Sequence, residues 1–172
     1  MIIGKNFPLI ILQIFKENII FAVFFASILL LIRSRIGKKN NVGCFFLYLY
    51  TGLIFGVTVL GRITDERVIT EDYLGICQLF SNPWYLVSFV ENILMFVLFG
   101  SLYVLAWKEE GHKSSCIRWA VFISVSIEFL QGIFQLGEAQ FIDICANVFG
   151  AWIGYMLASG WRKYRRKQKS NS

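Results

Sequence analysis

Long apolar segments constrain this chain more than any other feature. A helix that crosses the hydrocarbon core of a bilayer needs about 20 mostly apolar residues. Five segments have or approach this length: Glu17–Ile32, Val42–Gly61, one within Pro83–Trp107, one within Trp119–Gly137 and one within Phe141–Trp161. The second contains no charged residue at all. We therefore predict an all-α integral membrane protein, a bundle of five transmembrane helices.

Composition supports this prediction and argues against a bound cofactor. Of the 172 residues, 56% are hydrophobic, which is more than a soluble domain of this length can bury. The single histidine and four cysteines show no metal or redox spacing, so we expect no zinc or other cofactor. We predict one transmembrane domain over residues 1–161 and a basic tail over residues 162–172.

The distribution of Lys and Arg predicts how the chain is oriented. With five crossings, thirteen of the 17 Lys and Arg residues fall on one side of the membrane. Basic residues favour the cytoplasmic side, so the N-terminus should lie outside and the C-terminus in the cytoplasm. The tail "RKYRRKQK" (Arg162–Lys169) follows an apolar segment. We therefore expect it to contact anionic lipid headgroups rather than nucleic acid.

Polar side chains interrupt the last three apolar segments, and all are predicted to lie in the outer half of the bilayer. Residues 128, 131 and 135 are spaced i, i+3, i+7, and residues 143 and 147 are spaced i, i+4, so each set shares one helix face. A charged side chain near the bilayer centre costs about 2.5–3.5 kcal/mol. We therefore expect these faces to meet each other or a wetted cavity. The seven residues are Glu91, Asn92, Glu128, Gln131, Gln135, Asp143 and Asn147.

Six of these residues, all except Gln135, are candidate ligand-binding residues, together with Arg62. Arg62 is the predicted cation partner of Glu128, with Arg67 as a second choice. An alternative stays open for the carboxamides, which form hydrogen bonds between membrane helices in many proteins. The pairs Gly52/Gly56 and Gly150/Gly154 are interpreted as packing sites. Glu128 is interpreted as functional, because interhelical hydrogen bonding does not require a carboxylate.

Three short motifs carry a family resemblance. They are "ENILMFVLFG" (Glu91–Gly100), "EFLQ" (Glu128–Gln131) and "DICANVFG" (Asp143–Gly150). In this order and separation they resemble the VanZ-like family of small bacterial membrane proteins, although Leu98 and Gln140 stand where many members have Pro and Asp. The resemblance implies a multi-pass protein of the bacterial plasma membrane. It also implies an association with low-level resistance to the lipoglycopeptide antibiotic teicoplanin, and it brings no accepted catalytic assignment.

Two functional hypotheses follow. The first is an outer-leaflet polar cavity that binds or excludes an amphiphile among the membrane lipids, such as a lipoglycopeptide antibiotic or a lipid-linked cell-wall precursor. The second is an intramembrane acid/base enzyme that acts on a lipid-linked envelope substrate, with Glu128 and Asp143 as the catalytic pair. It ranks second because no activated nucleophile is evident, so whether the chain is an enzyme stays open. A transporter is disfavoured, because an ion path needs polar residues in both halves of the bilayer.

Overall fold

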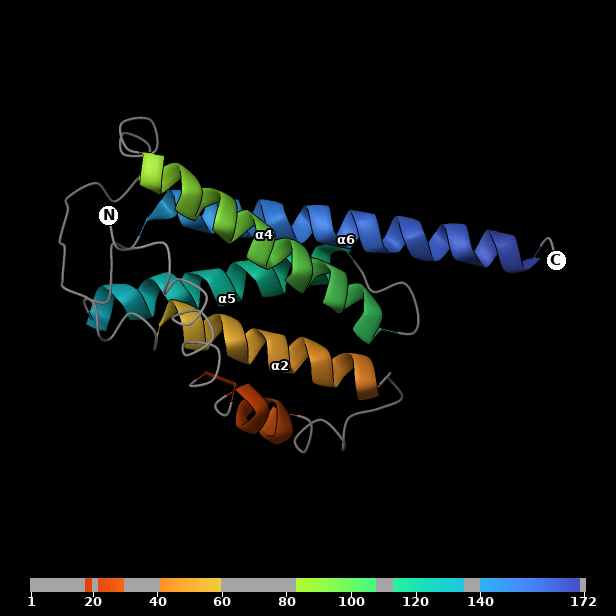
Figure 1. Ribbon diagram of the computed structural model, residues 1–172, viewed down its shortest axis with the longest axis horizontal. Helices are drawn as coiled ribbons and strands as arrows, with labels where there is room; N and C mark the ends of the chain where they lie inside the picture. Colours follow the sequence, from red (N-terminus) through yellow and green to blue (C-terminus); the bar gives the residue numbers. More distant parts are fainter. Residues whose placement is uncertain are drawn as a thin grey trace, which may run out of the picture.

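The described part of the chain is helical. The computed structural model describes residues 18–19, 22–29, 41–59, 83–107, 113–134 and 140–170. A helix covers residues 22–29, and four longer helices follow: α2 (Asn41–Thr58), α4 (Pro83–Ala106), α5 (Lys113–Phe134) and α6 (Phe141–Ser170) (Figure 1). Three of them, α4, α5 and α6, are long and apolar enough to cross a membrane, whereas α2 is apolar but shorter. The all-helical prediction is confirmed; five crossings and their orientation stay predictions.

The helices turn large apolar side chains outward. Phe122 and Phe129 on α5 are each 64% exposed, and Leu94 on α4 is 62% exposed. A helix that is hydrophobic all round belongs either in the core of a large protein or in a membrane. Since these side chains lie on the outside of a small bundle, their natural surroundings are lipid chains.

The closest helix pair is α4 and α6, which run in the same direction and cross each other (Figure 1). Glycines allow the approach. A Cβ atom at Gly150 would collide with the carbonyl of Ile93, and one at Gly154 with the carbonyl of Val97. Gly100 on α4 meets the backbone of α6 in the same way. The predicted packing role of the Gly150/Gly154 pair is confirmed, because small residues here let two backbones touch.

Helix α2 packs against α4 in the opposite direction. The hydroxyl of Tyr50 donates a hydrogen bond to the backbone carbonyl of Met95 at 2.9 Å. At the C-terminal end of α4, the thiol of Cys44 donates to the carbonyl of Ala106 at 3.4 Å. Since the residue numbers rise on one helix as they fall on the other, the pair is antiparallel.

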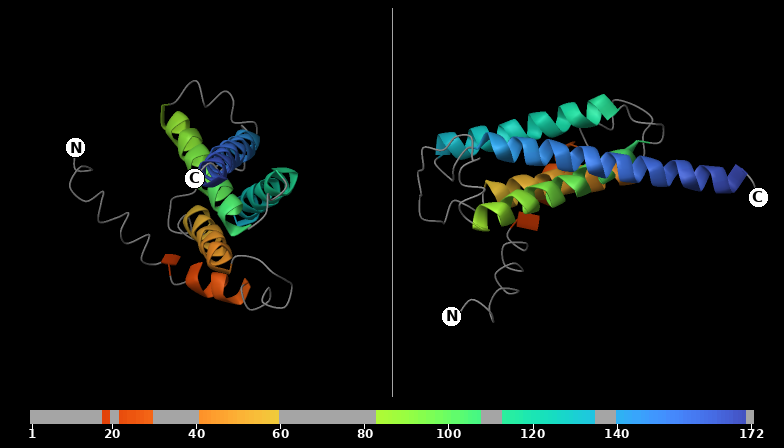
Figure 2. Two further views of the ribbon diagram at one scale, coloured as in Figure 1. Left: turned by 90° about the vertical axis from the view of Figure 1, so that its right-hand side faces the viewer. Right: turned by 90° about the horizontal axis from the view of Figure 1, so that it is seen from above.

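The other glycine pair lets the first helical stretch pack on α2. Gly52 lies against Ala22, and Gly56 lies against the side chain of Asn18. Figure 2 shows residues 22–29 beside α2 on the outside of the bundle, away from α6. Both predicted glycine pairs therefore serve helix packing.

Acidic and basic residues of the described segments lie in opposite halves of the bundle. In the described segments, all three carboxylates lie in the half where α4 and α6 begin and α5 ends, and we call this the acidic half. They are Glu91, Glu128 and Asp143. All Lys and Arg of the described segments lie in the opposite, basic half: Lys113, Arg118, Arg162, Lys163, Arg165, Arg166, Lys167 and Lys169. The positive-inside rule would place the basic half toward the cytoplasm.

Helix α6 continues past the rest of the bundle. It has 30 residues and ends at Ser170, so residues 162–170 of the predicted tail are its last turns. Figure 1 shows this end projecting beyond α4 and α5. Hydropathy falls at the tail, but Arg, Lys and Gln are good helix formers, and the helix therefore persists.

Arg162 joins α6 to the end of α4. Its guanidinium donates to the backbone carbonyl of Trp107 at 2.8 Å and to that of Val104. The last carbonyls of a helix have no donor within that helix, and a cation there also interacts favourably with the helix dipole. Arg162 thus caps α4 from a neighbouring helix.

We expect Arg162→Gln to lower the free energy of unfolding by about 1–3 kcal/mol, because α4 loses charge-assisted donors at its end. Denaturation in neutral detergent, followed by circular dichroism, measures this loss. The adjacent, exposed Lys163 is the matched control, and Lys163→Gln should change the free energy by less than about 0.5 kcal/mol. Equal losses from the two substitutions would contradict a capping role.

Candidate functional site

One face of α5 carries three buried polar side chains in the acidic half. Ser124, Glu128 and Gln131 are 0%, 7% and 2% exposed. Their i, i+4, i+7 spacing places them on a single face, as the sequence predicted for the last two. Each of the three contacts a different part of the chain. The face therefore gathers backbone and side chains from two other helices.

The side chain of Glu128, which belongs to α5, contacts the start of α6. Its Oε2 atom accepts a hydrogen bond from the backbone N–H of Gln140 at 2.9 Å. Gln140 directly precedes α6, and its carbonyl accepts the N–H of Asp143 at 3.2 Å. Negative charge is stabilised at a helix N-terminus, where N–H groups lack partners. The carboxylate thus has a structural role that the spacing of polar residues did not predict.

Gln131 joins the ends of α5 and α2. Its Nε2 atom donates to the backbone carbonyl of Thr58, the last residue of α2, at 2.9 Å. Because that carbonyl lies at a helix C-terminus, it has no donor within α2. This contact fits the alternative interpretation of the carboxamides as interhelical hydrogen bonds.

Asn147 connects α6 to α5 and leaves one atom unsatisfied. Its Nδ2 atom donates to the hydroxyl of Ser124 at 2.8 Å. The side chain is 2% exposed, and its Oδ1 atom has no hydrogen-bond partner. Among the described residues, no other buried side-chain oxygen or nitrogen lacks a hydrogen-bond partner. A buried acceptor without a donor costs about 1–3 kcal/mol, and a ligand N–H or O–H group would relieve that cost.

The other predicted residues are more peripheral. Glu91 is exposed on α4, Asn92 is half-buried one turn before Phe96, and Asp143 is half-buried in the first turn of α6. Arg62 and Gln135 lie outside the described residues. We use the name polar cluster for the groups that the structure brings together: the side chains of Ser124, Glu128, Gln131 and Asn147, the N–H of Gln140 and the carbonyl of Thr58.

Sequence reasoning missed Ser124, Gln140 and Thr58 as members of this cluster. Ser124 could have been found, because it lies four residues before Glu128 and extends the same stripe. The other two contribute backbone groups. Their positions depend on how the chain folds between helices, and no spacing rule within one helix could have indicated them.

Comparison with known proteins identifies the family. The model of the family described as VanZ/LLP1 matches residues 47–162, about two thirds of the chain. The chain belongs to the VanZ/LLP1 family. Protein VanZ of Enterococcus faecium is 26% identical over 80 residues, which are 46% of this chain and 49% of that relative. The match thus spans about half the length of that relative. No solved structure matches the chain significantly.

The family assignment covers the whole polar cluster. The matched residues begin within α2 and end at Arg162, so they include Thr58 and every other member. The resemblance stated from the three motifs is confirmed. Family membership, together with three helices able to cross a bilayer, makes this a membrane protein of the VanZ/LLP1 type.

Proposed function

We propose that this VanZ/LLP1 protein binds or excludes an amphiphile at the outer side of the plasma membrane, with the polar cluster as its recognition site. The amphiphile would be a lipoglycopeptide antibiotic of the teicoplanin type or a lipid-linked cell-wall precursor. The buried Oδ1 atom of Asn147 carries the proposal, because this acceptor has no donor among the described groups. It belongs to the "DICANVFG" motif that supports the family resemblance.

Charge separation supports the location of the site. The acidic half contains the polar cluster and all described carboxylates, whereas the basic half contains all described Lys and Arg. With the basic half toward the cytoplasm, the cluster would lie beneath the outer surface. The polar head of an amphiphile in the outer leaflet would reach this depth.

The chemistry of the cluster indicates the kind of group that it would recognise. The Oδ1 atom of Asn147 and the carboxylate of Glu128 are acceptors, while Gln131 and Asn147 each already use one N–H donor within the protein. A ligand with N–H, ammonium or hydroxyl donors would complement this arrangement. Peptide-bearing amphiphiles supply such donors beside a lipid chain, which the exposed apolar faces of the helices could accommodate.

Expression in a teicoplanin-sensitive Gram-positive host tests the proposal. We expect the minimum inhibitory concentration of teicoplanin to rise and that of a glycopeptide without an acyl tail to stay unchanged. Asn147→Leu should abolish the rise while the protein still accumulates in the membrane, because leucine fills the space without an acceptor. Ser126→Ala is the matched control, since Ser126 donates only to the carbonyl of Phe122 on its own helix. Full resistance with Asn147→Leu would show that Asn147 is not part of the recognition site.

The acid/base enzyme is distinguished by a double substitution. Glu128 already accepts the N–H of Gln140, so its carboxylate is held by the fold and we place binding ahead of catalysis. Glu128→Gln combined with Asp143→Asn removes both ionisable groups of the catalytic pair. Retained resistance in this variant would eliminate the enzyme, whereas lost resistance with normal membrane levels would show that at least one of the two ionisable groups is needed, for catalysis or for binding a cationic group.

A further inference from the structure

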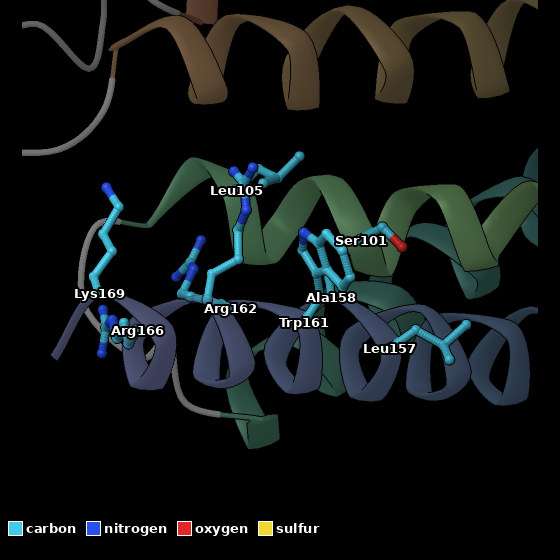
Figure 3. Close-up of a pocket in the computed structure, with 9 residues that line it drawn as sticks. Ser101, Leu105, Leu157, Ala158, Trp161, Arg162, Arg166 and Lys169 are labelled. Atoms are coloured by element: carbon cyan, nitrogen blue, oxygen red, sulfur yellow. The ribbon is translucent and has the colours of Figure 1, made fainter. Parts of the chain in front are cut away.

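A groove of about 690 Å³ lies between α4 and the projecting part of α6, in the basic half. Figure 3 shows Ser101 and Leu105 on α4 facing Trp161 and Arg162 on α6. The groove is unrelated to the polar cluster, which lies at the other end of the bundle. Its lining therefore calls for a separate explanation.

The lining of the groove changes from apolar to cationic along α6. Leu105, Leu157 and Ala158 form the part that lies within the bundle, and Arg165, Arg166 and Lys169 form the part beyond it. None of the described residues that line the groove is acidic. An apolar trough that opens onto a cluster of cations matches a molecule with a hydrocarbon chain and an anionic head.

The depth of these cations also fits such a molecule. Arg162 reaches the last carbonyls of α4, so α4 ends at about its level. Residues 165–169 then extend roughly 5–10 Å beyond this level, at 1.5 Å per helical residue. If α4 ends where the hydrocarbon core ends, Arg165 and Lys169 lie at the depth of lipid phosphates.

Trp161 marks the boundary between the two parts. It is 62% exposed, and tryptophan prefers the interface between hydrocarbon and headgroups. The guanidinium of Arg165 lies over its ring, 5.8 Å from the centroid. This cation–π contact holds one cation beside the groove and so lowers the entropy that binding an anion would cost.

We propose that this groove binds one anionic phospholipid. An acyl chain lies along Leu105 and Leu157, and the phosphate contacts Arg165, Arg166 and Lys169. Arginine suits this role because its planar guanidinium can form two parallel hydrogen bonds to phosphate oxygens. The inference is independent of the proposed function. It needs only that α6 crosses the bilayer, in either orientation.

Diffuse attraction between a basic helix and an anionic membrane is the competing explanation, and the chain supplies a matched control. Lys163 and Lys167 belong to the same turns of α6 but do not line the groove. The double substitutions Arg165→Gln/Arg166→Gln and Lys163→Gln/Lys167→Gln each remove two positive charges. Diffuse attraction predicts equal effects, whereas a built site predicts a large effect for the first pair alone.

Native mass spectrometry of the protein in neutral detergent measures the binding of phosphatidylglycerol. We expect one phosphatidylglycerol per chain and much weaker binding of phosphatidylcholine. The double substitution at Arg165 and Arg166 should weaken binding about thirtyfold or more, because two charge-assisted hydrogen-bonding groups are lost. The double substitution at Lys163 and Lys167 should change it by less than about threefold, since exposed charges outside the groove contribute little.

Four results would overturn the proposal. Equal losses from the two pairs would show diffuse attraction, and equal binding of phosphatidylcholine would show that the cations are not used. Competition by inorganic phosphate at similar concentration would show an anion site without a lipid chain. Leu105→Trp tests the apolar part: Leu105 is 54% exposed, so the larger side chain should fill the groove without unfolding the helix. Unchanged phosphatidylglycerol binding in this variant would exclude the acyl-chain contact.

Discussion

Gly154→Ala is expected to lower the free energy of unfolding by about 2 kcal/mol or more, although alanine is the better helix former. The added Cβ atom would meet the backbone carbonyl of Val97 on α4. A backbone carbonyl cannot rotate away as a side chain can, so α4 and α6 must separate. The separation costs the contacts of the most extensive helix pair in the bundle.

Gly160→Ala provides the matched control on the same helix. A Cβ atom at Gly160 meets nothing within 4 Å. Only the helix propensity then changes, and this favours alanine by up to about 1 kcal/mol. Unfolding in mixed detergent micelles, followed by circular dichroism, should therefore show opposite signs for the two substitutions. Stabilisation by both would contradict the close contact between α4 and α6.

The sequence predicted helix packing at Gly150 and Gly154 but not the identity of the partner. Four-residue spacing indicates one small face on one helix. It does not say that the face meets α4, nor that Gly100 on α4 contributes to the same contact. An isolated glycine at the end of an apolar run has several explanations, and only the crossing of the two helices selects one.

Helix boundaries were predicted best where hydropathy and helix propensity agree. The segment expected within Pro83–Trp107 is observed as Pro83–Ala106. The segment expected from Trp119 begins at Lys113, and the segment expected to reach Trp161 continues to Ser170. Hydropathy reports which residues suit hydrocarbon, whereas a helix ends where its hydrogen bonds end. The basic turns of α6 keep their helical hydrogen bonds although their side chains do not suit hydrocarbon.

The polar residues of α5 were predicted to share a face, and this face is buried. Their partners could not be predicted, because Glu128 and Gln131 bind backbone groups at the ends of other helices. The direction of each hydrogen bond follows from those ends. A helix N-terminus offers N–H groups and therefore needs an acceptor, whereas a helix C-terminus offers carbonyls and needs a donor.

This complementarity makes the order of Glu and Gln on α5 specific. Glu128 faces the N–H of Gln140, and Gln131 faces the carbonyl of Thr58. Glutamate can only accept when ionised, whereas glutamine can accept or donate. Exchanging the two residue types, one position at a time, should therefore have unequal effects.

Gln131→Glu is expected to lower the free energy of unfolding by about 3 kcal/mol or more. It leaves the Thr58 carbonyl without its donor and adds a carboxylate to a site that is 2% exposed. Glu128→Gln should cost about 1–2 kcal/mol at most, because its carboxamide oxygen still accepts from Gln140 while the charge at the start of α6 is lost. Denaturation of both variants in the same micelles measures the difference. Equal losses would mean that burial of charge, not the polarity of the two helix ends, determines which residue stands where.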